Sequence, residues 1–502
     1  MDAFHSLMTG FSIALTPQYL MFAFAGSIVG TLVGVLPGVG PSAGIAILIP
    51  LTFQLDATGA IIMLCAIFYG TQYGGTITSV LMNVPGEASS AVTCIDGYQM
   101  AKQGRAGAAL SIAAIGSFIG GTVATIALVF AAPPLTEFAL RFGPAETFAL
   151  MIFGISLVTS LAGKSMVKGL MMGVFGLLLA MVGMDPVRGS PRFTFGQVEL
   201  MDGVGFIPVI MGLLGLAEIL SNAENAMRPI LLGKMSSLLV SKKDIKDSVW
   251  PIIRGTAIGC FAGVIPGVSG AATSFMSYVA EKKFSKYPER FGTGVIEGVA
   301  GPETGNNAHA NAAFIPLFTL GIPPGAAAAV LMGAFIMNGL EPGPFLFTEH
   351  PDVVWPVIAS MYIGNVILVI LNLPLVSIWI KILQIPYSLL FGLILMFMII
   401  GAYSVKQTMF DVGLLTLFGV IGYALKKLDF PVAPAVLTLI LGPLMERSLR
   451  RALDLSQGDF SVFFTKPISA VLLALAVIFL LSPLLRFRPT WGGATEGEDA
   501  EV

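Results

Sequence analysis

Apolar runs of about 20 residues recur along most of this chain, and each is long enough to cross the hydrocarbon core of a bilayer as a helix. Of the 502 residues, 55% are hydrophobic and only 11% are charged, whereas soluble domains carry roughly 25% charged residues. In lipid, every backbone hydrogen bond must be satisfied within the protein, which favours helices. The sequence therefore predicts an all-α polytopic membrane protein with about 12 membrane-embedded helical segments.

A basic stretch near the middle divides these segments into two halves. Residues 223–249 contain Arg228, Lys234, Lys242, Lys243 and Lys246, and cytoplasmic loops are enriched in such side chains. We therefore predict four regions: a first transmembrane half (1–222), a basic cytoplasmic linker (223–249), a second transmembrane half (250–488) and a polar C-terminal tail (489–502).

The two halves share a repeated motif in which an apolar helix with regularly spaced glycines runs into a Pro-Gly pair. All its members recur 229 positions later: Gly26, Gly30, Gly34, Pro37 and Gly38 correspond to Gly255, Gly259, Gly263, Pro266 and Gly267. Small residues at every fourth position are typical of closely packed transmembrane helices. A helix broken inside the membrane once per half is typical of secondary transporters with inverted repeats. A basic loop precedes only the second break, so we expect the two breaks to enter from opposite sides of the membrane.

Two further breaks accompany this pair, at Pro85-Gly86 and at Pro323-Pro324-Gly325. A helix that resumes after a break presents free N–H groups and partial positive charge, which suit a carboxylate, and unwound carbonyl groups suit Na⁺. The alternative is that such pairs only kink or pack helices. We predict that the substrate binds at the tips of the broken helices. The candidate residues are Pro37, Gly38, Val39, Gly40, Asn83, Pro85, Gly86, Pro266, Gly267, Ser269, Gly270, Pro323, Pro324 and Gly325.

A polar cluster in the second half is the candidate site for a coupling ion. Its members are Glu303, Thr304, Asn306, Asn307 and Asn311. A carboxylate inside a membrane is costly and usually functional, and amide and hydroxyl oxygens suit an ion. The alternative is that this stretch is a cytoplasmic loop, because basic residues lie just before it.

For three other polar features we expect a structural and not a functional role. His309 is expected to be a satisfied histidine at a helix end, Glu87 to occupy the first turn of a helix, and residues 96–105 to form a polar loop. The cysteines Cys65, Cys94 and Cys260 lack pair spacing and are expected to be buried as small apolar residues. The sequence contains no metal-ligand cluster or nucleophile elbow, so the only expected cofactor is a coupling Na⁺ or H⁺. The net charge of −2 gives no indication of nucleic-acid binding.

Several motifs together resemble the large membrane subunit of tripartite tricarboxylate transporters, the TctA-type permeases. They occupy residues 34–41, 83–87, 96–105, 263–267, 298–307 and 318–323. The resemblance implies a multi-pass importer of the prokaryotic inner membrane, driven by a Na⁺ or H⁺ gradient. It also implies two partners, a small four-helix membrane subunit and a periplasmic solute-binding protein that delivers a carboxylate. Substrates in the family include tricarboxylates, dicarboxylates and aromatic carboxylates.

The chain departs from the family pattern at one tip. Small hydroxylated residues usually follow this break, but here Pro323-Pro324-Gly325 is followed by four alanines, residues 326–329. The missing hydroxyl groups favour a carboxylate less polar than citrate. A membrane-embedded enzyme or scaffold without transport activity remains the alternative function.

Overall fold

The computed structural model describes residues 3–36, 39–161, 165–185, 189–224, 240–383 and 387–481. Seven helices in this part of the chain are long and apolar enough to cross a membrane, and five shorter apolar helical stretches accompany them. The described strands are the two-residue pair β1 (Gly183–Met184) and β2 (Pro191–Arg192), which form an antiparallel ladder. The all-α polytopic fold class is thereby confirmed.

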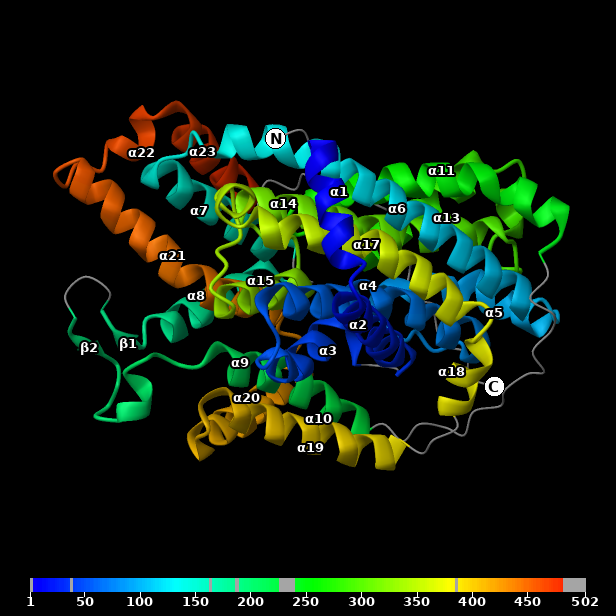
Figure 1. Ribbon diagram of the computed structural model, residues 1–502, viewed down its shortest axis with the longest axis horizontal. Helices are drawn as coiled ribbons and strands as arrows, with labels where there is room; N and C mark the ends of the chain where they lie inside the picture. Colours follow the sequence, from blue (N-terminus) through cyan, green and yellow to red (C-terminus); the bar gives the residue numbers. More distant parts are fainter. Residues whose placement is uncertain are drawn as a thin grey trace.

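The helices form two groups that each draw on both halves of the sequence. In the first, the core group, α2 packs on α4, α11 packs on α13, and α13 packs on α6 (Figure 1). The described helices of the core group are α1 (Ala3–Ala14), α2 (Pro17–Val35), α3 (Gly40–Leu48), α4 (Ala57–Met82), α5 (Thr93–Lys102), α6 (Ala106–Ala139), α11 (Lys242–Val264), α12 (Gly270–Phe284), α13 (Glu297–Ala312), α14 (Phe314–Leu320), α15 (Ala326–Met337), α16 (Leu346–Glu349), α17 (Pro351–Asn372) and α18 (Val376–Ile382). Three short 3-10 turns belong to it: η1 (Ile49–Thr52), η2 (Ala88–Ala91) and η5 (Pro288–Arg290).

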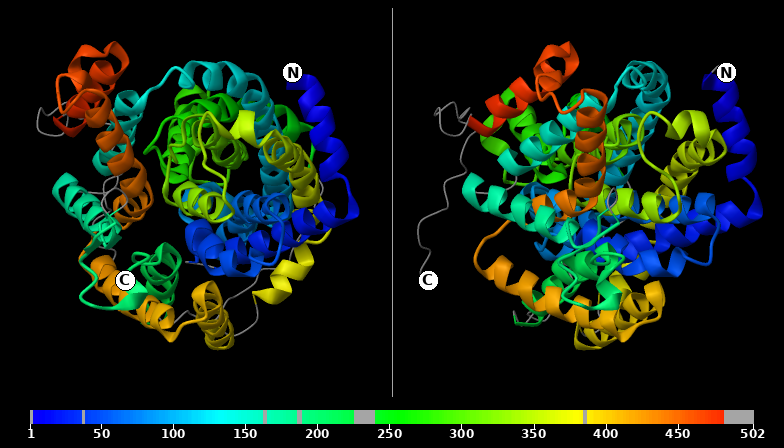
Figure 2. Two further views of the ribbon diagram at one scale, coloured as in Figure 1. Left: turned by 60° about the vertical axis from the view of Figure 1, so that its left-hand side comes forward. Right: turned by 90° about the vertical axis from the view of Figure 1, so that its left-hand side faces the viewer.

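The second, outer group covers one side of the core group, as the left view of Figure 2 shows. Within it α21 packs on α7 and α8, and α23 packs on α7. It touches the core group where α21 meets α15 and where the π-helical turn η4 meets α3. Its described elements are α7 (Pro144–Leu161), α8 (Met166–Ala180), β1, β2, η3 (Val198–Leu200), α9 (Phe206–Ile210), η4 (Met211–Leu216), α10 (Ala217–Glu224), α19 (Tyr387–Lys406), α20 (Met409–Lys427), α21 (Ala433–Leu455), α22 (Val462–Thr465) and α23 (Pro467–Leu481).

The repeated glycines are contact points between the helices of the core group. A Cβ atom at Gly30 of α2 would lie 2.7 Å from the carbonyl oxygen of Ile67 on α4. A Cβ atom at Gly259 of α11 would lie 2.4 Å from the carbonyl oxygen of Gly305 on α13. Since no side chain fits at these separations, the predicted packing face is confirmed in both halves.

The repeat continues through the second pair of breaks, with a different offset. Helix α4 ends at Asn83, in the left-handed region with φ 57°, and α14 ends at Gly321 with φ 66°. These caps lie 238 positions apart (321 minus 83), and Pro85 and Pro323 share that spacing. Each half therefore contributes two helix breaks in equivalent places.

Two stretches that could be read as loops are helices. Residues 96–105 were expected to form a polar loop, yet α5 covers most of them and Asp96 is fully buried. The loop alternative for the polar cluster of the second half is also wrong, because α13 is helical from Glu297 to Ala312 and buried over nearly all its length. In both cases glycine and polar residues, which suggest a loop in water, pack between helices.

The predicted linker and tail are described only in part. Helix α11 begins at Lys242, inside the stretch predicted as a linker. Residues 225–239 and the tail, 489–502, lie outside the described residues.

Candidate functional site

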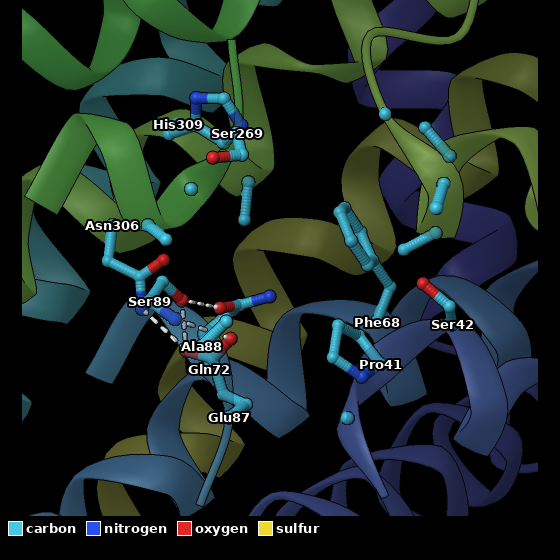
Figure 3. Close-up of a pocket in the computed structure, with 18 of the residues that line it drawn as sticks. Pro41, Ser42, Phe68, Gln72, Glu87, Ala88, Ser89, Ser269, Asn306 and His309 are labelled. Carbon is cyan, nitrogen blue, oxygen red and sulfur yellow. Dashed lines mark hydrogen bonds between the residues drawn. The ribbon is translucent and has the colours of Figure 1, made fainter. Parts of the chain in front are cut away.

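Residues within or just after each of the four helix breaks line one cavity of about 590 Å³ (Figure 3). Its lining comes from the start of α3, the segment after α4, the start of α12 and the start of α15. Leu214 and Glu218 of the outer group complete the wall, so the cavity lies between the two groups of helices. The sites that the sequence places at four separate breaks are thus one site in space.

Three helices of the core group begin at this cavity. Gly40 starts α3, Gly270 starts α12 and Ala326 starts α15, and all three residues line the cavity. The Ser269 hydroxyl caps α12 by accepting a hydrogen bond from the N–H of Ala272 at 3.2 Å. Among the described residues, no side chain caps α3 or α15. Their first N–H groups have no partner within the helix and carry partial positive charge, so they are available to an anion.

An ion pair fixes the direction of α12. Glu281, near its C-terminal end, is 2% exposed and is bound by the guanidinium group of Arg254 on α11, with Nε 2.8 Å from Oε1. The two helices that flank the break at Pro266-Gly267 are therefore held to each other beyond the break.

One wall of the cavity is polar and is built around Glu87. Its Oε2 accepts a hydrogen bond from the N–H of Ser89 at 3.1 Å, and its Oε1 accepts one from Nδ2 of Asn306 at 3.2 Å. The Ser89 hydroxyl lies within hydrogen-bond reach of Glu87 Oε1 and also of Gln72 Oε1, 3.0 Å away. Figure 3 shows these side chains gathered together. Because the Glu87 carboxylate caps the short η2 turn, it occupies the N–H groups that an anion would otherwise find there.

The opposite wall is mainly apolar. Phe68 of α4 and Pro41 of α3 lie there beside Ser42 (Figure 3). The alanines 326–328 of α15 also line the cavity. A ligand in this space would thus meet a polar face on one side and an apolar face on the other.

None of the described lining residues is Lys or Arg. The titratable residues among them are Glu87, Glu218 and His309, and Glu218 is paired with Lys426 at 2.6 Å. Attraction for an anion therefore has to come from the helix starts and not from a basic side chain.

The predicted substrate-binding residues are partly brought together here. Those that line the cavity are Val39, Gly40, Pro85, Gly86, Ser269, Gly270, Pro324 and Gly325. Pro266, Gly267 and Pro323 belong to the breaks but are not among the lining residues, and Asn83 is an exposed helix cap. Pro37 and Gly38 lie outside the described residues.

The predicted ion-coupling residues separate onto different faces of α13. Asn306 lines the cavity, whereas Thr304 and Asn311 pack against α6. Asn307 also turns to α6, where its Nδ2 donates to the Ser117 hydroxyl at 2.7 Å. The Glu303 carboxylate is buried and is not among the lining residues.

Two hydroxyl groups hold that carboxylate. Thr76 Oγ1 donates to Glu303 Oε2 at 2.6 Å, and Thr93 Oγ1 donates to the other carboxylate oxygen. Within the described residues neither Glu303 nor Glu87 is paired with Lys or Arg. Each half of the fold thus supplies a buried carboxylate that has no basic partner among the described residues.

The sequence prediction missed several lining residues. Glu87 was expected only as a first-turn residue, and His309, whose Nδ1 lies 3.0 Å from Thr273 Oγ1, only as a satisfied histidine. Glu87 instead precedes the helical turn and caps η2, His309 has the expected hydrogen-bond partner, and both residues also line the cavity. Gln72 and Phe68 carry no sequence signal, because α4 is simply an apolar helix rich in glycine and threonine. The position of Glu87 immediately after a Pro-Gly break was the one sequence feature that could have indicated its place in the cavity.

Comparison with known proteins gives a consistent result. The model of the family described as "Tripartite tricarboxylate transporter TctA family" matches residues 20–437. An Agrobacterium vitis protein, described as an uncharacterized 52.8 kDa protein in the TAR-I ttuC' 3' region, is 50% identical over 97% of this chain and 98% of its own length. A second protein of that organism, described as uncharacterized and in the TAR-II ttuC' 3' region, is 49% identical over 45% of this chain and 94% of its own length. No solved structure matches. The chain therefore belongs to the tripartite tricarboxylate transporter TctA family.

Proposed function

We propose that this chain is the large permease subunit of an ion-gradient-driven carboxylate importer of the inner membrane. A periplasmic solute-binding protein delivers the carboxylate, and a small four-helix membrane subunit completes the assembly. Membership of a transporter family favours transport over the enzyme or scaffold alternative. The observation that carries the proposal is the convergence of four helix breaks on one cavity.

The carboxylate group binds at the uncapped starts of α3 and α15. Both present N–H groups and partial positive charge to the cavity, which is the usual way in which a helix start binds an anion. The starts of α12 and η2 are weaker candidates, because Ser269 and Glu87 already cap them.

The rest of the substrate lies against the apolar wall. Phe68 and the alanines 326–328 offer contact area without hydrogen-bond donors or acceptors in their side chains. A carboxylate with an aromatic or otherwise apolar body is therefore favoured over one with several hydroxyl groups, since buried hydroxyl groups without partners are costly.

Transport proceeds by alternating access around this cavity. Residues of the core group form most of its lining, and Leu214 and Glu218 of the outer group close one side. Movement of one group against the other would open the cavity to each side of the membrane in turn.

The proposal is tested by reconstitution with the two partner subunits in liposomes. Uptake of radiolabelled citrate and phthalate, a polar and an aromatic carboxylate, is measured under imposed Na⁺ or H⁺ gradients. We expect uptake that collapses when the gradient is dissipated. Absence of gradient-dependent uptake across a panel of di-, tri- and aromatic carboxylates would contradict the proposal.

A further inference from the structure

We propose that the polar wall of the cavity is a sodium site, formed by Glu87, Gln72 and Asn306. The proposal rests on the proposed function and deepens it, because it identifies the coupling ion and where it binds. Sodium and the carboxylate would then occupy opposite walls of the same cavity.

The first argument is an excess of acceptor oxygens. Glu87 Oε1 and Gln72 Oε1 both lie within reach of the Ser89 hydroxyl, which has one proton and can serve only one of them. Glu87 Oε1 has a second donor in Asn306 Nδ2, whereas Gln72 Oε1 depends on Ser89. The Oδ1 atom of Asn306 has no hydrogen-bond partner among the described residues, although this residue is 1% exposed and lines the cavity. A buried acceptor without a donor is costly, and a cation would satisfy these oxygens together.

The second argument is the charge of Glu87. Its carboxylate accepts hydrogen bonds from the N–H of Ser89 and from Asn306 Nδ2, which stabilise the ionised form, whereas burial of the carboxyl group disfavours that form. No Lys or Arg among the described residues lines the cavity. A cation bound beside it would offset the cost of burial and keep the carboxylate ionised. One carboxylate together with neutral amide oxygens is the kind of ligand set that a hard cation prefers.

The arrangement also explains how the ion and the substrate would be coupled. Without a cation, Glu87 repels an anionic substrate in the same small, poorly solvated cavity. Sodium bound at the polar wall removes that repulsion. Each ligand therefore increases the affinity of the cavity for the other, and linkage requires the two effects to be equal.

The test begins with sodium alone. Binding of ²²Na⁺ to the purified full chain is measured by scintillation proximity, with unlabelled NaCl or KCl as competitor. We expect saturable binding that NaCl displaces and KCl does not. Glu87→Gln and Asn306→Ala should weaken it by about tenfold or more, since the first removes the negative charge of the site and the second removes a ligand. Wild-type protein that binds no sodium, or variants that bind it as well as wild type, would overturn the proposal.

Glu349→Gln is the matched control. Glu349 is exposed and is not among the residues that line the cavity, so this variant should keep the sodium affinity of the wild type. A loss equal to that of Glu87→Gln would mean that removal of any carboxylate has this effect, and the assigned site would be wrong. Thermal unfolding of each variant in detergent separates a lost site from a lost fold.

The second arm measures coupling in liposomes that contain the partner subunits. In the wild type, external Na⁺ should raise the apparent affinity for the transported carboxylate, whereas Glu87→Gln should take up carboxylate with an affinity independent of Na⁺. Uptake driven by a pH gradient without any Na⁺ requirement would overturn the sodium site and leave the carboxylate importer intact. Absence of carboxylate uptake under either gradient would instead contradict the proposed function.

Discussion

The backbone N–H of Gly267 donates a hydrogen bond to the carbonyl oxygen of Pro324, with the nitrogen and oxygen 2.8 Å apart. This bond joins two helix breaks of the second half. In the first half a Cβ atom at Gly86 would lie only 2.1 Å from the carbonyl oxygen of Gly34, just before the break at Pro37-Gly38. In the second half, therefore, the two breaks are joined backbone to backbone, and in the first half the break at Pro85-Gly86 packs closely against the end of α2.

Adding a methyl group at Gly259 should separate α11 from α13. Its Cβ would lie 2.4 Å from the carbonyl oxygen of Gly305 and 2.5 Å from the Cβ of Ala308. Overpacking of this kind costs about 1–3 kcal/mol, so Gly259→Ala should lower the unfolding temperature in detergent. Gly392→Ala is the control, because nothing lies within 4 Å of a Cβ there. Equal stability of the two variants would show that the helices are not in close contact.

Asp96 should be essential for holding the loop before α13 in place. Its carboxylate accepts hydrogen bonds from the N–H groups of Gly294 at 2.8 Å and Val295 at 3.0 Å, and from the Tyr278 hydroxyl at 2.8 Å. Hydrogen bonds to a buried charge are worth about 1.5–3 kcal/mol each. Asp96→Asn should therefore destabilise the protein strongly and make this loop sensitive to protease.

Tyr278→Phe removes only one of those hydrogen bonds, so we expect a smaller loss of stability. Asp352→Asn, at an exposed position in the first turn of α17, should leave the unfolding temperature nearly unchanged. If Asp96→Asn behaves like Asp352→Asn, the loop is held by other contacts.

Substitutions of Asn306 and Asn307 should have different effects, although the two residues are adjacent. Asn306 lines the cavity, whereas Asn307 donates to Ser117 on α6. Asn306→Ala should therefore impair the ion dependence of uptake. Asn307→Ala should lower stability by about 1–3 kcal/mol, because it removes a buried partner, and leave the ion dependence intact. The two properties are compared by uptake against Na⁺ concentration and by thermal unfolding, and the reverse assignment would place the cavity on the wrong face of α13.

A hydroxyl group at the start of α15, where alanines line the cavity, should change the substrate preference. Ala326 is the first residue of α15 and lines the cavity. Ala326→Ser should raise the uptake of citrate relative to phthalate, since it adds a hydrogen-bond donor to the apolar wall. Ala334→Ser, in the buried interior of α15 away from the lining, serves as control. An unchanged citrate-to-phthalate ratio would show that the tip does not contact the substrate.

The sequence predicted most of the fold because its strongest signals are local. Apolar length identified the membrane helices, and the recurring glycines identified the packing faces of α2 and α11. The glycine-rich and polar composition of α5 and α13 suggested loops, which is wrong. Helix propensities measured in water do not apply where glycine and polar residues pack between helices.

The site was harder to predict because it is assembled from distant parts of the chain. The individual breaks could be found, since Pro and Gly act locally. That they meet at one cavity depends on tertiary packing, as does the separation of Asn306 from Asn307 on α13. Glu87 and Gln72 face each other only because α4 and the segment after it fold back together, which no local pattern records.

The central claim is that the tips of α3 and α15 contact the transported carboxylate, and thiol labelling tests it most directly. Ser42→Cys and Ala326→Cys are introduced singly into a background in which the three native cysteines are changed to Ala. Labelling by a membrane-impermeant methanethiosulfonate is timed with and without the transported carboxylate, and Phe195→Cys, at an 83% exposed position, is the control. We predict that the carboxylate slows labelling at both tips and not at the control. Equal labelling rates at both tips with and without the carboxylate would contradict the account.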